Sequence, residues 1–224
     1  MRIYSIFRSI DGEVNGFHQG RTSVFVRVAG CNLRCSYCDT MYAVEAKGKE
    51  MSVDEIVGVV KEFGGVKKVT ITGGEPLLYR GELKRLLLRL RREGYRVSVE
   101  TNGSLGIIPL PYGVVGPWLS WVVDWKLPSS GMSKEMKVED FVLLSPYDFV
   151  KFVVGERRDF EEAKEVMKLL REGGCEAQFA FSPVWGKLDP ATLAMWVFRE
   201  ELDVVLNLQL HKIIWPDCGE GRER

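Results

Sequence analysis

Apolar residues recur along the chain in short runs with two kinds of spacing. Runs that are rich in β-branched residues, or apolar at every second position, predict strands at residues 22–29, 67–72, 95–101, 119–125, 149–154, 176–181 and 204–210. Amphipathic or well-capped segments predict helices at residues 53–63, 81–93, 160–171 and 190–200. Strands and helices therefore alternate along most of the chain.

Capping signals mark the ends of these helices. Ser52 and Glu55 form a capping box before residues 53–63, and Asp189 precedes Pro190 at the start of the last predicted helix. Glycines follow two of the helices at residues 64–65 and 173–174, where the chain leaves the helical conformation. These local signals support the helix boundaries.

Alternating strands and helices favour a parallel sheet with right-handed crossovers. Residues 104–119 are irregular and rich in Pro and Gly, so at least one crossover lacks a clear helix. We expect an α/β fold, a partial (β/α)6-type, TIM-like barrel of parallel strands with some crossover helices reduced. One catalytic domain would span residues 1–216, in which residues 3–20 begin apolar and become a Gly-punctuated loop. Residues 217–224 would form a polar C-terminal tail.

Composition narrows the class of protein. The chain has 224 residues, 46% of them hydrophobic, which suits one domain with a sizeable core. Lys plus Arg and Asp plus Glu each number 31, so no net charge draws the chain to nucleic acid or to an anionic membrane. No segment reaches roughly 18 uninterrupted apolar residues, and the N-terminus does not resemble a secretory signal. Five cysteines, three of them clustered, do not form a disulfide framework, so we expect a cytoplasmic protein.

Polar and Gly-rich motifs directly follow several predicted strands. In parallel sheets of this kind, ligands bind at the carboxyl ends of the strands, which meet at one edge. The motifs that would meet there are residues 31–38, 73–76, 100–103, 124–131 and His211. The sequence therefore predicts a ligand site on this rim.

Three cysteines, Cys31, Cys35 and Cys38, lie within eight residues of one another. Thiolates are soft ligands that favour iron–sulfur clusters, zinc or copper(I). A structural zinc site takes four protein ligands, and a 4Fe–4S cluster usually takes four thiolates. No fourth cysteine or histidine lies nearby, so three thiolates would leave one iron open to a small molecule. A structural zinc knuckle is the alternative interpretation.

The spacing Cys-x-x-x-Cys-x-x-Cys, with the aromatic Tyr37 before the last cysteine, resembles the signature of the radical S-adenosylmethionine (SAM) enzymes. The resemblance implies that the three cysteines bind a 4Fe–4S cluster. It also implies that the open iron binds the amino and carboxylate groups of SAM. An electron from the cluster would then cleave SAM to methionine and a 5′-deoxyadenosyl radical.

The resemblance extends to motifs behind later strands. Residues 73–76, Gly-Gly-Glu-Pro, resemble the superfamily's GGEP turn, whose backbone and glutamate hold the SAM amino group. Residues 100–103, Glu-Thr-Asn-Gly, resemble the end of a core strand, and residues 124–126 occupy a position where the superfamily contacts SAM. The SAM-binding residues implied are Tyr37, Cys38, Asp39, Gly73, Gly74, Glu75, Glu100, Asn102, Asp124, Trp125 and Lys126.

Three further motifs resemble the 7-carboxy-7-deazaguanine synthase family: Cys38-Asp39-Thr40, residues 7–16 and residues 208–212. This resemblance implies conversion of 6-carboxy-5,6,7,8-tetrahydropterin to 7-carboxy-7-deazaguanine and ammonia, a step of queuosine and archaeosine biosynthesis. It also implies a magnesium ion bound through Thr40, whose hydroxyl is a hard ligand.

The family's substrate places chemical demands on the pocket. A carboxylate suits a bidentate arginine such as Arg27, and the 2-amino-pyrimidinone edge presents N–H donors to an ionised Glu13. His211 would bond the carboxylate or a ring heteroatom. The substrate-binding residues expected are Ile10, Asp11, Gly12, Glu13, Arg27, Thr72 and His211. Asp11 departs from the family pattern, which usually has glutamine there.

Two other functions stay open at this point. A glycyl-radical-enzyme activating enzyme shares the short chain and the cysteine spacing but acts on a protein. A metal-stapled binding module without catalysis would need the cysteines alone. The family resemblance further implies a flavodoxin or ferredoxin as electron donor, a homodimer, and no nucleic-acid or membrane partner.

Overall fold

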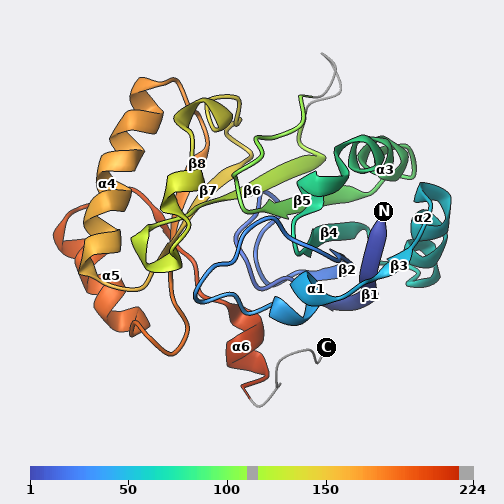
Figure 1. The fold of residues 1–224 in the computed structure, drawn as a ribbon, viewed down its shortest axis with the longest axis horizontal. Coiled ribbons are helices and arrows are strands. Elements are labelled where there is room, and N and C mark those ends of the chain that lie inside the picture. Colours follow the sequence, from blue (N-terminus) through green and yellow to red (C-terminus); the bar gives the residue numbers. More distant parts are fainter. Residues whose placement is uncertain (110–115, 217–224) are drawn as a thin grey trace.

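The computed structural model describes residues 1–109 and 116–216, and its centre is one nine-stranded sheet (Figure 1). The strands are β1 (Arg2–Ile10), β2 (Thr22–Val28), β3 (Lys49–Glu50), β4 (Lys68–Gly73), β5 (Arg96–Thr101), β6 (Leu119–Trp125), β7 (Phe149–Val154), β8 (Gln178–Pro183) and β9 (Val205–Leu206). Their order in the sheet is β3-β1-β2-β4-β5-β6-β7-β8-β9. From β2 to β9 every neighbouring pair is parallel, which is the predicted α/β partial barrel.

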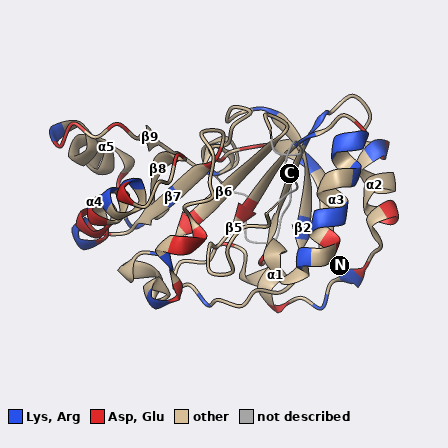
Figure 2. Cartoon of the chain, turned by 90° about the horizontal axis from the view of Figure 1, so that it is seen from above, with Lys and Arg blue, Asp and Glu red and all other residues tan. Residues whose placement is uncertain are grey.

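The longer helices cover the outside of this sheet, with α2 and α3 near β4 and β5, and α4 and α5 near β7 and β8 (Figure 1). The helices are α1 (Met41–Glu45), α2 (Val53–Glu62), α3 (Arg80–Arg92), α4 (Arg157–Glu172), α5 (Pro190–Arg199) and α6 (Leu210–Ile214). Figure 2 shows both signs of charge on α4 and mainly Lys and Arg on α3. None of the helices in the described residues is long and apolar enough to cross a membrane.

Local sequence signals set α2, α3, α4 and α5 close to their predicted bounds, whereas the short helices α1 and α6 were not predicted. The capping box at α2 is present, with the Glu55 amide donating to the Ser52 hydroxyl and the Ser52 amide donating to the Glu55 carboxylate. The Asp189 side chain accepts from the Thr192 amide at the start of α5. In α3 the apolar face is fully buried: Leu83, Leu86, Leu87 and Leu90.

Pairing between distant segments changed two expectations, whereas the expected reduction of crossover helices is seen before β7. Residues 2–10 form the full strand β1, antiparallel to both β2 and β3, rather than the start of a loop. The strand expected at 204–210 is wrong beyond Leu206, because the buried Asn207 leaves the sheet and the chain then turns into α6. The crossover before β7 contains only three short 3-10 turns, η2 (Pro128–Ser130), η3 (Ser133–Glu135) and η4 (Val138–Asp140). Residues 217–224 lie outside the described residues.

Candidate active site

A cavity of about 690 Å³ opens at the carboxyl ends of the parallel strands, and we call it the basin. It gathers side chains from the cysteine loop after β2, from β4 to β7 and from residues 209–216. Eighteen of the 21 residues expected from the sequence line it: Ile10, Asp11, Glu13, Arg27, Cys31, Cys35, Tyr37, Cys38, Asp39, Thr40, Thr72, Gly73, Gly74, Glu100, Asn102, Asp124, Lys126 and His211. Gly12, Glu75 and Trp125 do not.

The cysteine loop forms one wall of the basin, and its three thiols are free. The backbone amide of Leu33 donates to the Cys31 sulfur at 3.4 Å, and the Asn102 side chain donates to the same sulfur at 3.6 Å. Burial raises the pKa of the Cys35 thiol, although the neighbouring Lys126 opposes that shift. Donors aimed at sulfur and a nearby cation stabilise thiolates, the form that binds iron.

The wall also suits a ligand beside the thiols. The Tyr37 hydroxyl is buried and has no hydrogen-bond partner among the described residues, and burial raises its pKa. A buried hydroxyl without a partner is costly unless a bound molecule satisfies it. No three Cys, His, Asp or Glu side chains of the described residues are grouped as ligands of one metal ion. The kinds of donor present, three thiols on one loop beside a polar lining and an unsatisfied hydroxyl, suit a cluster with a small polar ligand, although the thiols are not gathered around one point.

The backbone of the Gly-Gly turn after β4 is hydrogen-bonded to the segment that leads into the cysteine loop. The Gly74 amide donates to the Val28 carbonyl at 3.0 Å, and the Glu75 amide donates to the Gly30 carbonyl at 2.8 Å. A Cβ on Gly74 would lie 1.8 Å from the Gly30 oxygen, so only glycine fits this approach. The turn therefore fixes the position of the chain that leads into Cys31.

The expected role of the Glu75 carboxylate is not supported by its position. Glu75 is fully buried, and its two oxygens accept from the Leu77 amide, the Thr101 hydroxyl and the Asn102 amide, each within 2.8 Å. Burial raises its pKa, which these hydrogen bonds oppose. The carboxylate joins the turn η1 (Pro76–Tyr79) to the end of β5 instead of facing the basin.

Trp125 and Gly12 also differ from expectation. Side chains alternate along β6, so Asp124 faces the basin while Trp125 packs in the core, 5.0 Å from the Phe141 ring between centroids. A Cβ on Gly12 would lie 2.6 Å from the His211 imidazole. Gly12 therefore makes room for His211 and does not itself line the basin.

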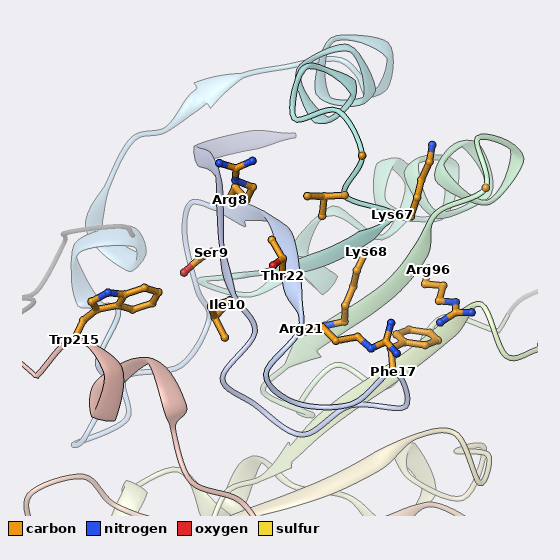
Figure 3. A pocket seen from close by; sticks show the side chains of 13 residues that line it. Arg8, Ser9, Ile10, Phe17, Arg21, Thr22, Lys67, Lys68, Arg96 and Trp215 are labelled. Carbon is orange, nitrogen blue, oxygen red and sulfur yellow. The ribbon is translucent and has the colours of Figure 1, made fainter.

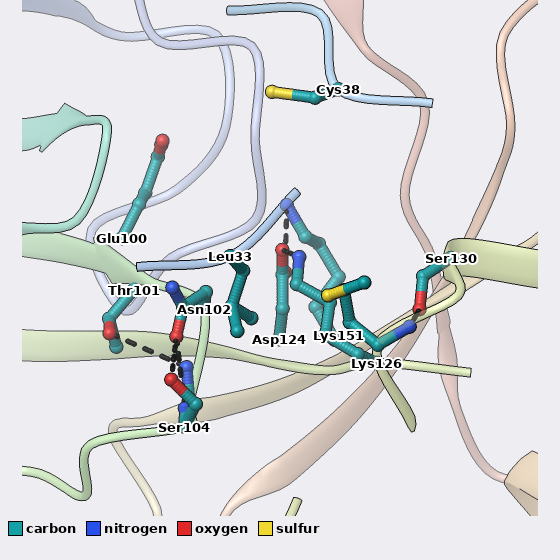
Figure 4. Close-up of polar contacts among 12 residues, drawn as sticks. Leu33, Cys38, Glu100, Thr101, Asn102, Ser104, Asp124, Lys126, Ser130 and Lys151 are labelled. Carbon is teal, nitrogen blue, oxygen red and sulfur yellow. Dashed lines mark hydrogen bonds and ion pairs between the residues drawn. The ribbon is translucent and has the colours of Figure 1, made fainter. Parts of the chain in front are cut away.

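A ladder of alternating charges crosses the basin floor, and Figure 4 shows Asp124 between its two lysines. Asp124 contacts Lys126 at 2.6 Å and Lys151 at 3.2 Å, and Lys151 reaches Glu13 at 3.1 Å. Burial works against the charge on Asp124, yet the two lysines lower its pKa. Burial likewise opposes the charge on Lys151, but Asp124 and Glu13 raise its pKa well above the usual value. The four side chains thereby form one continuous series of ion pairs at low exposure.

Glu100 is the exception among the buried carboxylates. Burial raises its pKa to about 7, with Asp11 and Glu13 adding to the shift. The Thr72 hydroxyl donates to Glu100 at 2.7 Å and partly opposes it. Near neutral pH this carboxyl can therefore hold a proton inside the basin.

The expected substrate residues have defined partners. The Arg27 guanidinium lies over the rings of Phe7 and Tyr42, at 5.6 and 5.8 Å from their centroids. Both oxygens of Asp11 are engaged by the protein, one by the Glu13 amide and the other by Lys68 and Thr70, which suits a structural role at the floor. Burial lowers the pKa of His211.

Five residues around the basin were not predicted: Lys68, Lys151, Asn207, Gln209 and Lys212. Asn207 and Gln209 donate to the Glu13 carboxylate at 2.6 and 3.0 Å, and Lys212 pairs with Asp39 at 2.8 Å. Lys151 had a usable signal, because it is the one charged residue within the apolar strand Phe149–Val154. The contacts of Asn207 and Gln209 span more than 190 residues and carry no local signal.

Comparison with known proteins agrees with this geometry. A family model described as the Radical SAM superfamily matches residues 25–108, which include the cysteine loop, the Gly-Gly turn and Glu100. The chain is thus a radical SAM enzyme.

Full-length relatives narrow this class. The chain is 39% identical to a 7-carboxy-7-deazaguanine synthase of Koribacter versatilis, over 99% of this chain and 100% of that protein. It is 40% identical to the synthase of Clostridium acetobutylicum, over 98% of each chain. The chain belongs to the 7-carboxy-7-deazaguanine synthase family. The crystal structure of QueE from Escherichia coli shares the fold, with a TM-score of 0.72, 23% identity and 93% of each chain covered.

Proposed function

We propose that the basin binds 6-carboxy-5,6,7,8-tetrahydropterin and converts it to 7-carboxy-7-deazaguanine and ammonia. The 7-carboxy-7-deazaguanine synthase activity and its place in queuosine precursor biosynthesis follow from family membership. One observation carries the assignment of this chemistry to the basin. A single cavity is lined both by three free thiols and by Glu13, Arg27 and His211.

Cys31, Cys35 and Cys38 would hold the 4Fe–4S cluster, and the backbone of Gly73 and Gly74, with Lys126, would hold SAM. When bound, this pair supplies a 5′-deoxyadenosyl radical for hydrogen abstraction. The chain's own contribution is to orient the substrate and to exclude water from the reacting atoms. Membership of a synthase family leaves no support for the activating enzyme or the non-catalytic module.

Glu13 and Arg27 are proposed to orient the pterin. Lys151, Asn207 and Gln209 hold Glu13 in place, and its Oε1 accepts only one of these donors. A carboxylate oxygen can accept two hydrogen bonds, so Oε1 keeps capacity for an N–H of the pyrimidinone edge. The Arg27 guanidinium lies beside the rings of Phe7 and Tyr42 and would bind the substrate carboxylate through its planar fork.

The position of the abstracted hydrogen tests this orientation. C6 carries the carboxylate, so pinning that group by Arg27 would present C6 to the radical. With substrate deuterated at C6, we expect deuterium in the 5′-deoxyadenosine that is recovered. Product formation alongside unlabelled 5′-deoxyadenosine would show that the orientation is wrong.

Magnesium binding is proposed at Thr40. The Thr40 hydroxyl lies at the basin wall, 3.3 Å from the Gly73 carbonyl and 3.7 Å from the Cys38 sulfur. A hydroxyl and a carbonyl oxygen are hard ligands that suit magnesium. Thr40→Ala should lower the magnesium dependence of turnover while the iron content stays unchanged. Equal turnover of the unmodified chain with and without a magnesium chelator would refute this site.

The partners expected from the family are also proposals. A flavodoxin or ferredoxin would supply the electron, and the four free cysteines of the described residues suit a reducing cytoplasm. A homodimer is supported by apolar side chains exposed on α5, Phe198 at 78% and Met195 at 46%. Sedimentation of the full chain at several concentrations would test that state.

A further inference from the structure

A second pocket lies at the end of the sheet that the basin does not use (Figure 3). It is lined by the end of β1 and by the starts of β2, β4 and β5. Parallel strands β2, β4 and β5 all begin there, and β1 ends there because it runs antiparallel to β2. We call it the amino-end pocket. It adjoins the basin only through Ser9, Ile10 and Trp215, which line both cavities.

The charge of the amino-end pocket has one sign. Five cations line it, Arg8, Arg21, Lys67, Lys68 and Arg96, and none of its described lining residues is an Asp or Glu. Lys68 is neutralised by Asp11, and Lys67 lies 4.9 Å from the Tyr95 ring centre. The three arginines make no ion pair with a described carboxylate. Figure 3 shows Arg21 and Arg96 extending toward the same end of the pocket.

The three arginines are exposed, so their donors are open to an anion from solution. A planar guanidinium fork matches phosphate oxygens in pairs. The pocket volume of about 1040 Å³ is that of a small-molecule site of nucleotide size. Nucleic acid is a weaker match, because binding it strongly takes roughly six to ten phosphate contacts along an extended track. The chain as a whole also has a formal net charge of +0.

We propose that the amino-end pocket is a binding site for a small polyphosphate-bearing anion, such as a nucleoside triphosphate, with Arg8, Arg21 and Arg96 as its phosphate ligands. The pterin substrate carries no phosphate, so this ligand is distinct from the reactants of the basin. The half-buried Trp215 lines the same pocket and offers aromatic surface for a base.

Calorimetry with inorganic tripolyphosphate tests the site on the full chain, purified anaerobically with its cluster, at about 150 mM salt, where exposed charges are screened. We expect one site per chain and a Kd that rises about tenfold or more in Arg21→Ala/Arg96→Ala. The double variant Arg21→Lys/Arg96→Lys keeps the positive charges but loses the guanidinium forks. Its Kd should lie between those of the unmodified chain and the double alanine variant. Arg199→Ala, an exposed arginine at the end of α5, is the matched control and should change Kd by less than about twofold.

Three results would overturn the proposal. The first is no measurable heat with the unmodified chain, and the second is an equal loss of binding in Arg199→Ala, which indicates unspecific charge attraction. The third is loss of tripolyphosphate binding in Arg27→Ala while the Arg21/Arg96 variants bind normally. That result would show that the anion binds in the basin. A single-stranded oligonucleotide without terminal phosphates should not displace tripolyphosphate, and efficient displacement would identify a nucleic-acid surface instead. None of these measurements requires the synthase activity.

Discussion

Individual thiols have distinct roles that their surroundings explain. Cys175 is 3% exposed in the core between α4 and β8, and burial raises the pKa of its thiol. We expect Cys175→Ala to keep the full iron content at a cost of about 1 kcal/mol in unfolding free energy. Cys31→Ala, Cys35→Ala and Cys38→Ala should each lose the cluster, measured as iron per chain and as absorbance of the anaerobic protein. Iron loss in Cys175→Ala would contradict the assignment. Cys218, expected to be equally dispensable, lies outside the described residues.

The raised pKa of Glu100 predicts a specific pH dependence of stability. A carboxyl whose folded pKa is about 7, against an ordinary value of 4.5, binds a proton more tightly in the folded state. Its contribution therefore falls as pH rises from 4.5 to 7, by at most about 3 kcal/mol. Glu100→Gln keeps the acceptor for Thr72 but cannot ionise, so this fall should be missing. Urea unfolding of both chains at several pH values measures the difference, and parallel curves would refute the prediction.

At the scale of single residues, the sequence predicted which residue types meet at the basin better than it predicted which way their side chains point. The spacing of Cys31, Cys35 and Cys38 correctly predicted that all three line one cavity, because a short loop keeps them close together. Glu75 was assigned to SAM because its motif was recognised, yet its carboxylate is buried outside the basin lining and accepts from the Leu77 amide, the Thr101 hydroxyl and the Asn102 amide. Trp125 could have been excluded in advance, since strand alternation directs it away from Asp124.

At the scale of elements, the close contact between the turn after β4 and the cysteine loop gives a sharp prediction. Gly74→Ala would drive a Cβ into the Gly30 carbonyl and displace the chain before Cys31. We expect destabilisation by about 2–4 kcal/mol and lower iron retention. Gly58→Ala is the matched control, since its Cβ meets nothing within 4 Å on α2, and it should stabilise by up to about 1 kcal/mol. Iron content and urea unfolding would measure both, and a neutral Gly74→Ala would refute the argument.

Helices were predictable and sheet edges were not, for a physical reason. The capping box at Ser52 and the leucine face of α3 are interactions within one segment, so the sequence shows them directly. The strand β1 exists because it pairs with β2 and β3, and β9 stops at Leu206 because Asn207 turns toward Glu13. Those contacts depend on segments far away in the chain.

At the scale of the whole molecule, the basin floor joins both ends of the chain through buried charge. Four carboxylates, Asp11, Glu13, Glu100 and Asp124, face three lysines, Lys68, Lys126 and Lys151. Glu13 comes from the N-terminal loop, its partner Asn207 from the C-terminal segment, and Lys151 from β7 between them.

Lys151 is therefore the residue whose loss should affect the whole fold. Lys151→Met would leave Asp124 and Glu13 buried without their shared cation, and we expect a loss of about 3–5 kcal/mol in unfolding free energy at pH 7. Lys151→Arg keeps the charge and should recover part of this loss. Lys168→Met is the matched control, because its pair with Glu165 is 66% exposed on both sides and should contribute less than about 0.5 kcal/mol. Lowering the pH protonates the two stranded carboxylates, so the deficit of Lys151→Met should shrink toward pH 4. A deficit that is the same at pH 4 and pH 7 would assign the loss to packing rather than to the charge ladder.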